Sequence, residues 1–128
     1  MILDTSALVA ILTAEEGAAA LSLRLAVAAR VLVPAHVLLE ASMVLVGRKT
    51  PQEIADLDAY LARIDAEVLP FTAAHAEAAR AAFLRYGKGR DPAGLNFGDC
   101  MSYAVARVEG LPLLFVGDDF ARTDVARA

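Results

Sequence analysis

The chain opens with Met1-Ile-Leu-Asp4-Thr-Ser-Ala-Leu-Val-Ala-Ile-Leu12, and this stretch decides the fold class. Three apolar residues lead into a polar group, Asp4-Thr5-Ser6, and an apolar run with helical character follows from Ala7 to Leu12. Any of the three polar side chains can cap the first turn of that helix. The stretch therefore predicts a short strand, a polar turn and a helix.

The rest of the chain alternates between strands and helices in the same way. We expect helices over residues 15–29, 35–46, 50–64, 72–86 and 97–109, and strands over residues 31–33, 67–71 and 113–116. Thr50-Pro51 reads as an N-cap followed by proline at the first helical position. Short apolar strands between longer helices predict an α/β three-layer sandwich, in which helices flank a central, mostly parallel sheet.

Length and composition predict one domain over residues 1–128, because a chain of 128 residues has no room for a second independent core. Hydrophobic residues make up 58% of the chain, yet no uncharged run approaches the roughly 18 to 20 residues of a membrane helix. The N-terminus lacks the basic and apolar regions of a secretory signal, and Cys100 is the only cysteine. We therefore expect a soluble protein of the reducing cytoplasm.

The charge balance argues against broad electrostatic binding to nucleic acid, because the net charge is −4 and the isoelectric point is near 5.1. Any such contact must be local. Arg85, Lys88 and Arg90 place three cations within six residues and form the best candidate for a phosphate contact. The alternative is a solvated, glycine-containing loop with no binding role.

Acidic residues follow the first and the last expected strand. Asp4 follows residues 1–3, and Asp118 and Asp119 follow residues 113–116. In open α/β sheets the ligand site lies beyond the carboxyl ends of the strands, so these acids are candidates for one shared site. The plainer alternatives are a helix cap for Asp4 and an ordinary turn for Gly117-Asp118-Asp119.

Two further acids lie in apolar helices. Glu40 interrupts a helix that is apolar nearly all round, and a carboxylate buried there must be paired, protonated or bound to a metal. Asp99 lies in the first turn of another apolar helix, where a negative charge also interacts favourably with the helix dipole. Glu40 is thus the stronger candidate on physical grounds alone.

The motifs around these acids resemble the PIN-domain family, and within it the VapC toxins. The resemblance covers nearly the whole chain. It rests on residues 1–12, Leu38-Leu-Glu40-Ala-Ser-Met-Val-Leu45, Tyr86 to Cys100, and Leu113 to Asp124. It implies an endoribonuclease that depends on Mg²⁺ or Mn²⁺, is inhibited by a VapB-type antitoxin, commonly dimerises, and leaves 5′-phosphate and 3′-hydroxyl ends.

The resemblance also implies an ordered set of site residues. Asp4, Glu40 and Asp99 match the family's acids, and the fourth acid is either Asp119, which the related endings favour, or Asp118. Carboxylate oxygens suit Mg²⁺ or Mn²⁺, and Asp4 and Asp99 are the expected direct ligands. Candidate substrate-binding residues, some of which can instead hydrogen-bond the acids, are Thr5, Ser6, Asn96, Lys88 and Arg90. Asp124 is expected to be a turn or cap residue outside the site.

Other functions fit the sequence less well. A receiver-type signalling domain needs an early acidic pair and a phosphoacceptor at the end of a central strand, whereas Asp56 and Asp58 lie in a helical stretch. A phosphatase of the haloacid-dehalogenase type needs a second aspartate two residues after Asp4, where Ser6 stands. A PIN fold that only binds partners stays open.

The sequence also contains two histidines and a cysteine that could be reactive, and apolar helices that could form a binding surface. We expect His36 and His75 to have structural roles, because each lies in apolar helical surroundings and is separated from the acids in the sequence. We expect Cys100 to be inert, because it lies in an apolar helix. The apolar helices between residues 15 and 61 are expected to offer a groove to an antitoxin segment. An arginine of that antitoxin would enter the acidic pocket.

Overall fold

The computed structural model describes residues 1–47 and 52–128, and the proposed cap at Thr50-Pro51 lies outside the described residues. The elements are, in chain order, β1 (Ile2–Leu3), α1 (Thr5–Leu12), α2 (Ala18–Ala26), β2 (Leu32–Pro34), α3 (Ala35–Val46), α4 (Gln52–Arg63), β3 (Glu67–Leu69), α5 (Ala73–Tyr86), α6 (Phe97–Glu109), β4 (Leu113–Leu114) and the short 3₁₀ helix η1 (Phe120–Arg122). The four strands form one parallel sheet in the order β3-β2-β1-β4. No helix among the described residues is long and apolar enough to cross a bilayer.

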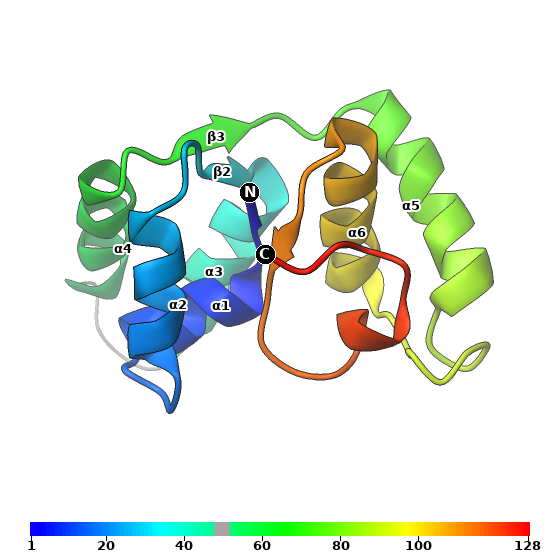
Figure 1. Ribbon diagram of the computed structural model, residues 1–128, viewed down its shortest axis with the longest axis horizontal. Helices are drawn as coiled ribbons and strands as arrows, with labels where there is room; N and C mark the ends of the chain where they lie inside the picture. Colours follow the sequence, from blue (N-terminus) through cyan, green and yellow to red (C-terminus); the bar gives the residue numbers. More distant parts are fainter. Residues whose placement is uncertain (48–51) are drawn as a thin grey trace.

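Helices cover both faces of this sheet. Figure 1 shows α1 to α4 on one side of the strands and α5 and α6 on the other. Successive strand residues point to opposite faces, so Leu3 and Leu114 belong to the core beneath α1 to α4, while Ile2 and Leu113 belong to the core beneath α5 and α6. The predicted three-layer α/β sandwich with a parallel sheet is confirmed.

The largest differences from the expected boundaries are in the second helix, which ends at Ala26 rather than at residue 29, and in the last two strands, of which β3 ends at Leu69 rather than at residue 71. The second helix begins at Ala18 rather than at residue 15, because Gly17 adopts a left-handed conformation (φ 87°) that breaks the chain away from a continuous helix. Strand β4 ends at Leu114 rather than at residue 116. The backbone N–H of Val116 donates to the Ser6 hydroxyl instead of a neighbouring strand.

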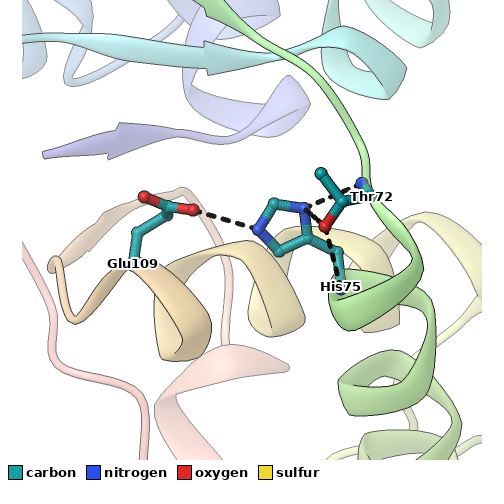
Figure 2. A network of polar contacts seen from close by, with 3 residues as sticks. All are labelled: Thr72, His75 and Glu109. Carbon is teal, nitrogen blue, oxygen red and sulfur yellow. Dashed lines mark hydrogen bonds and ion pairs between the residues drawn. The ribbon is translucent and has the colours of Figure 1, made fainter.

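His75 has the structural role that the sequence predicts, and Figure 2 shows its contacts. Its side chain is 2% exposed and lies in the first turn of α5. The Thr72 N–H donates to Nδ1 (3.0 Å), so the ring carries its proton on Nε2 and donates from there to Glu109 Oε1 (3.1 Å). This bond ties the N-terminus of α5 to the C-terminus of α6.

Asp124 joins the C-terminal segment to α5 and α6. The hydroxyl of Tyr103, a side chain that is 7% exposed, donates to Asp124 Oδ1 (2.5 Å), and Arg85 lies 3.3 Å from Oδ2. The hydrogen bond from Tyr103 and the nearby arginines hold the pKa of Asp124 below its ordinary value. Asp124 is therefore a structural residue, as predicted.

Tyr103→Phe is expected to lower the free energy of unfolding by about 1 kcal/mol at pH 7, because it removes a hydrogen bond to a partly exposed carboxylate. A carboxylate with a lowered folded pKa stabilises the fold above its unfolded pKa, and this stabilisation disappears as the pH falls through the folded value. The difference from wild type should therefore shrink below about pH 4. Urea unfolding at pH 7 and pH 3 measures it, with Tyr86→Phe as the control; a difference that is the same at both pH values would contradict the prediction.

Candidate carboxylate site for a divalent metal

Acidic side chains from three elements meet at the carboxyl edge of the sheet. Asp4 follows β1, Glu40 lies in the second turn of α3, which follows β2, and Asp99 lies in the first turn of α6. They line one cavity of about 300 Å³. Its lining residues are Asp4, Thr5, Ser6, Val9, Glu15, Glu40, Val44, Asp99 and Val116. The predicted convergence of the first three acids is thus present in the fold.

Asp4 is held by the residues that follow it. Its side chain is 5% exposed, and its Oδ2 accepts hydrogen bonds from the backbone N–H of Ser6 (2.9 Å) and from the Ser6 hydroxyl (2.6 Å). Asp4 therefore caps α1, so the cap interpretation and the site interpretation are both compatible with its position. The Ser6 hydroxyl also accepts from the Val116 N–H (3.0 Å), which fixes the chain just after β4 against the site.

Glu40 is held between α1 and α6. The Thr5 hydroxyl donates to its Oε2 at 2.6 Å. On the other side lies Gly98, where a Cβ atom would stand 2.9 and 3.0 Å from the two carboxylate oxygens. A side chain at position 98 would therefore displace the Glu40 carboxylate, so glycine at this position lets α6 approach it closely.

Asp99 belongs to a capping box at the start of α6. Its backbone N–H donates to the Asn96 side chain (3.0 Å), and the Asn96 backbone N–H donates to Asp99 Oδ2 (2.8 Å). Burial raises the pKa of Asp99 to about 6 against the lowering effect of that hydrogen bond, and the charges of Asp4, Asp119 and Glu40 raise it further. The four carboxylates are thus close enough to repel one another.

The donor atoms fit a hard divalent cation such as Mg²⁺ or Mn²⁺. Asp4, Glu40 and Asp99 each use one carboxylate oxygen in the hydrogen bonds given above. Within residues 1–47 and 52–128, the second oxygen of each makes no hydrogen bond. The same residues contain no group of three side chains already in metal-ligand geometry. The fit therefore rests on oxygen donors of the right type, on their unused oxygens, and on a repulsion that a cation would relieve.

The remaining predicted residues lie around the cavity or outside its lining. Asp118 and Asp119 are exposed after β4, and Asp119, unlike Asp118, is among the charges that raise the pKa of Asp99. Lys88 and Arg90 lie in the loop before α6 and do not line the cavity, and the Arg90 guanidinium lies over the Phe83 ring, 5.4 Å from its centroid. Thr5, Ser6 and Asn96 all hydrogen-bond to the acids.

Glu15 is a cavity residue that the sequence did not single out. It was expected to begin a helix, but it follows Ala14, which has a positive φ of 53°, and lies in the turn between α1 and α2. The Thr13 hydroxyl donates to its Oε1 at 3.0 Å. Gly17, inside the expected helix, was the available signal for a turn.

Comparison with known proteins identifies the family of this chain. The model of the PIN domain matches residues 1–126. The chain is 46% identical over 126 residues to "Ribonuclease VapC" of Mycolicibacterium smegmatis, covering 98% of both chains. It is 42% identical over 126 residues to "Ribonuclease VapC30" of Mycobacterium tuberculosis, covering 98% of this chain and 96% of the relative.

Solved structures share the fold. The crystal structure of VapC20 from Mycobacterium tuberculosis, a Sarcin-Ricin loop cleaving toxin, superposes with a TM-score of 0.80 at 22% identity, covering 99% of this chain and 97% of that chain. A toxin-antitoxin complex from Klebsiella pneumoniae gives a TM-score of 0.75 at 20% identity, with 99% and 95% covered. From its sequence match along almost its whole length, this chain belongs to the PIN-domain family and, within it, to the VapC ribonuclease toxins of VapBC toxin-antitoxin systems.

Proposed function

We propose that this chain, acting as one domain, is an endoribonuclease that uses Mg²⁺ or Mn²⁺ held by Asp4 and Asp99 to hydrolyse RNA phosphodiester bonds. The observation that carries the proposal is the cavity lined by Asp4, Glu40 and Asp99, each of which keeps one oxygen free of hydrogen bonds. Burial, and then the charges of the neighbouring acids, raise the pKa of Asp99 there. Carboxylates gathered without a cation destabilise the fold, so their convergence favours a metal site.

The acids have different roles in the proposed reaction. Asp4 and Asp99 would hold the cation, which would supply positive charge to offset the carboxylates and to polarise the scissile phosphate. Glu40, anchored by Thr5, and Asp119, whose charge acts on Asp99, would accept hydrogen bonds from the attacking water and orient it. The water oxygen bonds to phosphorus and gives up a proton to one of these carboxylates. The bond from phosphorus to the 3′-oxygen breaks and that oxygen takes up a proton from solvent, which leaves a 5′-phosphate and a 3′-hydroxyl.

Substrate contacts come from around the cavity. Thr5 and Ser6 already donate to acids, so we assign them to holding Glu40 and Asp4. Asn96 is exposed at the start of α6 and can also reach a phosphate. Lys88 and Arg90 lie in the loop between α5 and α6, before the helix that carries Asp99, and we assign them to the RNA backbone because an acidic chain needs local cations there.

Two apolar surfaces suit protein partners. Leu23 and Val27 are exposed at α2, within the region where the sequence predicts a groove for a VapB-type antitoxin. A larger cavity of about 740 Å³ lies between α5 and α6 and includes Phe83 and Phe97, the latter 83% exposed. We assign this second surface to a homodimer contact. A monomer in sedimentation equilibrium at micromolar concentration would contradict that assignment.

The test uses purified chain free of antitoxin, incubated with total RNA in Mn²⁺, in Mg²⁺ and in excess EDTA. Cleavage is expected in both metals and should disappear with EDTA, and end-labelling should find 5′-phosphates. Asp119→Asn is expected to lower the rate about 10-fold or more, with Asp118→Asn as the neighbouring control. Cleavage that survives EDTA would contradict the metal-dependent mechanism, and a larger loss from Asp118→Asn would reverse the assignment of the fourth acid.

Such a chain belongs in the reducing cytoplasm, where its RNA substrates are. Cys100 is buried and unpaired, as expected for an inert thiol in the core. An antitoxin arginine entering the acidic cavity would meet the same unused carboxylate oxygens that the metal needs.

A further inference from the structure

We propose that His36 is a positioning residue for the ribonuclease site, and that its hydrogen bond to Ser102 sets the spacing between Glu40 and Asp99. The inference rests on the proposed function, because it concerns how the acids of that site are held. It departs from the sequence expectation that His36 is only a structural residue of an apolar helix.

His36 and Ser102 each lie about one helical turn from one of the two acids. His36 lies four residues before Glu40 on α3, and Ser102 lies three residues after Asp99 on α6, so each pair shares one helix face. The His36 Nε2 and the Ser102 Oγ are 3.1 Å apart. The helices α3 and α6 contact each other, and this bond joins them one turn away from the carboxylates.

The His36 ring is fixed in this orientation although its other nitrogen is unsatisfied. Its Nδ1 is buried and is the one buried side-chain nitrogen or oxygen of the described residues that has no hydrogen-bond partner. Leaving such an atom unpaired costs about 1 to 3 kcal/mol. The edge of the ring packs at 77° to Phe71, with the ring centroids 5.6 Å apart, which holds the imidazole against α6.

Ser102 has no exposure to solvent, so the bond to His36 is a buried link rather than a surface contact. Burial lowers the pKa of His36 to about 4, although the charge of Asp4 opposes this effect. The ring is therefore neutral at pH 7 and can link the helices without placing a positive charge beside a cation site. A lysine or arginine in the same place would compete with the metal.

Losing this link should change the site more than the fold. Without it, α3 can shift relative to α6, and Glu40 then moves relative to Asp99. Removing residues that orient metal ligands typically weakens metal binding by about 10 to 100-fold. RNA contacts outside the cavity would be unaffected, so the Michaelis constant for RNA should not follow the loss in turnover.

The experiment compares wild type, His36→Leu, Ser102→Ala, the double variant and His36→Gln, whose amide nitrogen can replace the imidazole Nε2. Mn²⁺ affinity is measured by titration calorimetry, RNA cleavage is resolved into kcat and KM, and the metal-free melting temperature is recorded. Tyr103→Phe is the matched control, because Tyr103 is also buried on α6 but its hydroxyl bonds to Asp124, outside the cavity lining. Asp99→Asn reports on the site itself.

We expect His36→Leu and Ser102→Ala each to weaken Mn²⁺ binding and to lower kcat by about 10-fold, with KM unchanged. The double variant should bind Mn²⁺ no more weakly than either single variant, because all three variants remove the same hydrogen bond. His36→Gln should recover most of the affinity, and Tyr103→Phe should lower the melting temperature while Mn²⁺ binding stays at the wild-type level.

Wild-type Mn²⁺ affinity in His36→Leu, together with lost affinity in Asp99→Asn, would overturn this inference and leave the proposed function standing. A Tyr103→Phe variant that loses as much affinity for the same loss of stability would also overturn it. Absence of Mn²⁺ binding in the wild type would overturn both.

Discussion

Asp4→Asn is expected to lower kcat for RNA cleavage by about 10³-fold and to leave the fold intact. Asparagine has the shape of aspartate and caps a helix equally well, so the bonds from the Ser6 N–H and hydroxyl can persist. The variant removes only the negative charge of this side chain from the cavity lining. A neutral amide is a poor ligand for a hard cation compared with a carboxylate.

Single-turnover cleavage of a defined RNA measures this loss, and the melting temperature of the metal-free protein measures the fold. Asp4→Ala is the matched control, because it also removes the cap of α1 and should cost about 1 kcal/mol of stability in addition. Asp4→Asn protein that is folded and cleaves RNA at the wild-type rate would show that the site does not use this carboxylate.

Asp99→Asn is expected to have opposite effects on activity and on metal-free stability. Cleavage should fall by about 10² to 10³-fold, because a direct metal ligand is lost. The melting temperature of the metal-free protein should rise by about 4 °C, since the variant removes a charge that burial and the repulsion of Asp4, Asp119 and Glu40 disfavour. The Asn96 capping box can keep its acceptor.

Differential scanning calorimetry with EDTA and with saturating Mn²⁺ separates the two effects. Wild type should gain stability on adding Mn²⁺, as any ligand that binds only the folded state produces, and Asp99→Asn should gain little. A metal-free variant less stable than wild type would mean that Asp99 stabilises α6 more than it repels its neighbours. Asp65→Asn, in a turn away from the cavity, controls for the loss of one negative charge.

The opposed effects of Asp99 illustrate how this site is built. The acids are not free side chains on a surface, because Thr5, Ser6 and Asn96 each hold one of them by a hydrogen bond. The residues that the sequence singled out as possible substrate contacts thus also act on the acids. Holding one oxygen of each carboxylate leaves the other available in a fixed direction.

The amino-acid sequence by itself determined the layered α/β fold and identified three of the acids that line the cavity. Strands and helices have different periodicities of apolar residues, and Asp4 and Gly117 each end an apolar run. The order of strands and helices could therefore be predicted from the sequence. The bounds of α3 and α6 agree with prediction because both helices begin at clear signals, after Pro34 and at the Asn96 cap. Glu40 stood out because an apolar helix rarely carries an unpaired carboxylate.

Only the tertiary structure decided which side chains act together. Contacts between Thr5 and Glu40, between Gly98 and Glu40, and between His36 and Ser102 join residues that are 35 to 66 positions apart, or that lie on different helices, and no local pattern encodes them. Glu15 entered the cavity through a turn, and Asp119 rather than Asp118 acts on Asp99 through the geometry of its loop. Local propensities depend on neighbours in sequence, whereas a site depends on distances that the packing of α1, α3 and α6 sets.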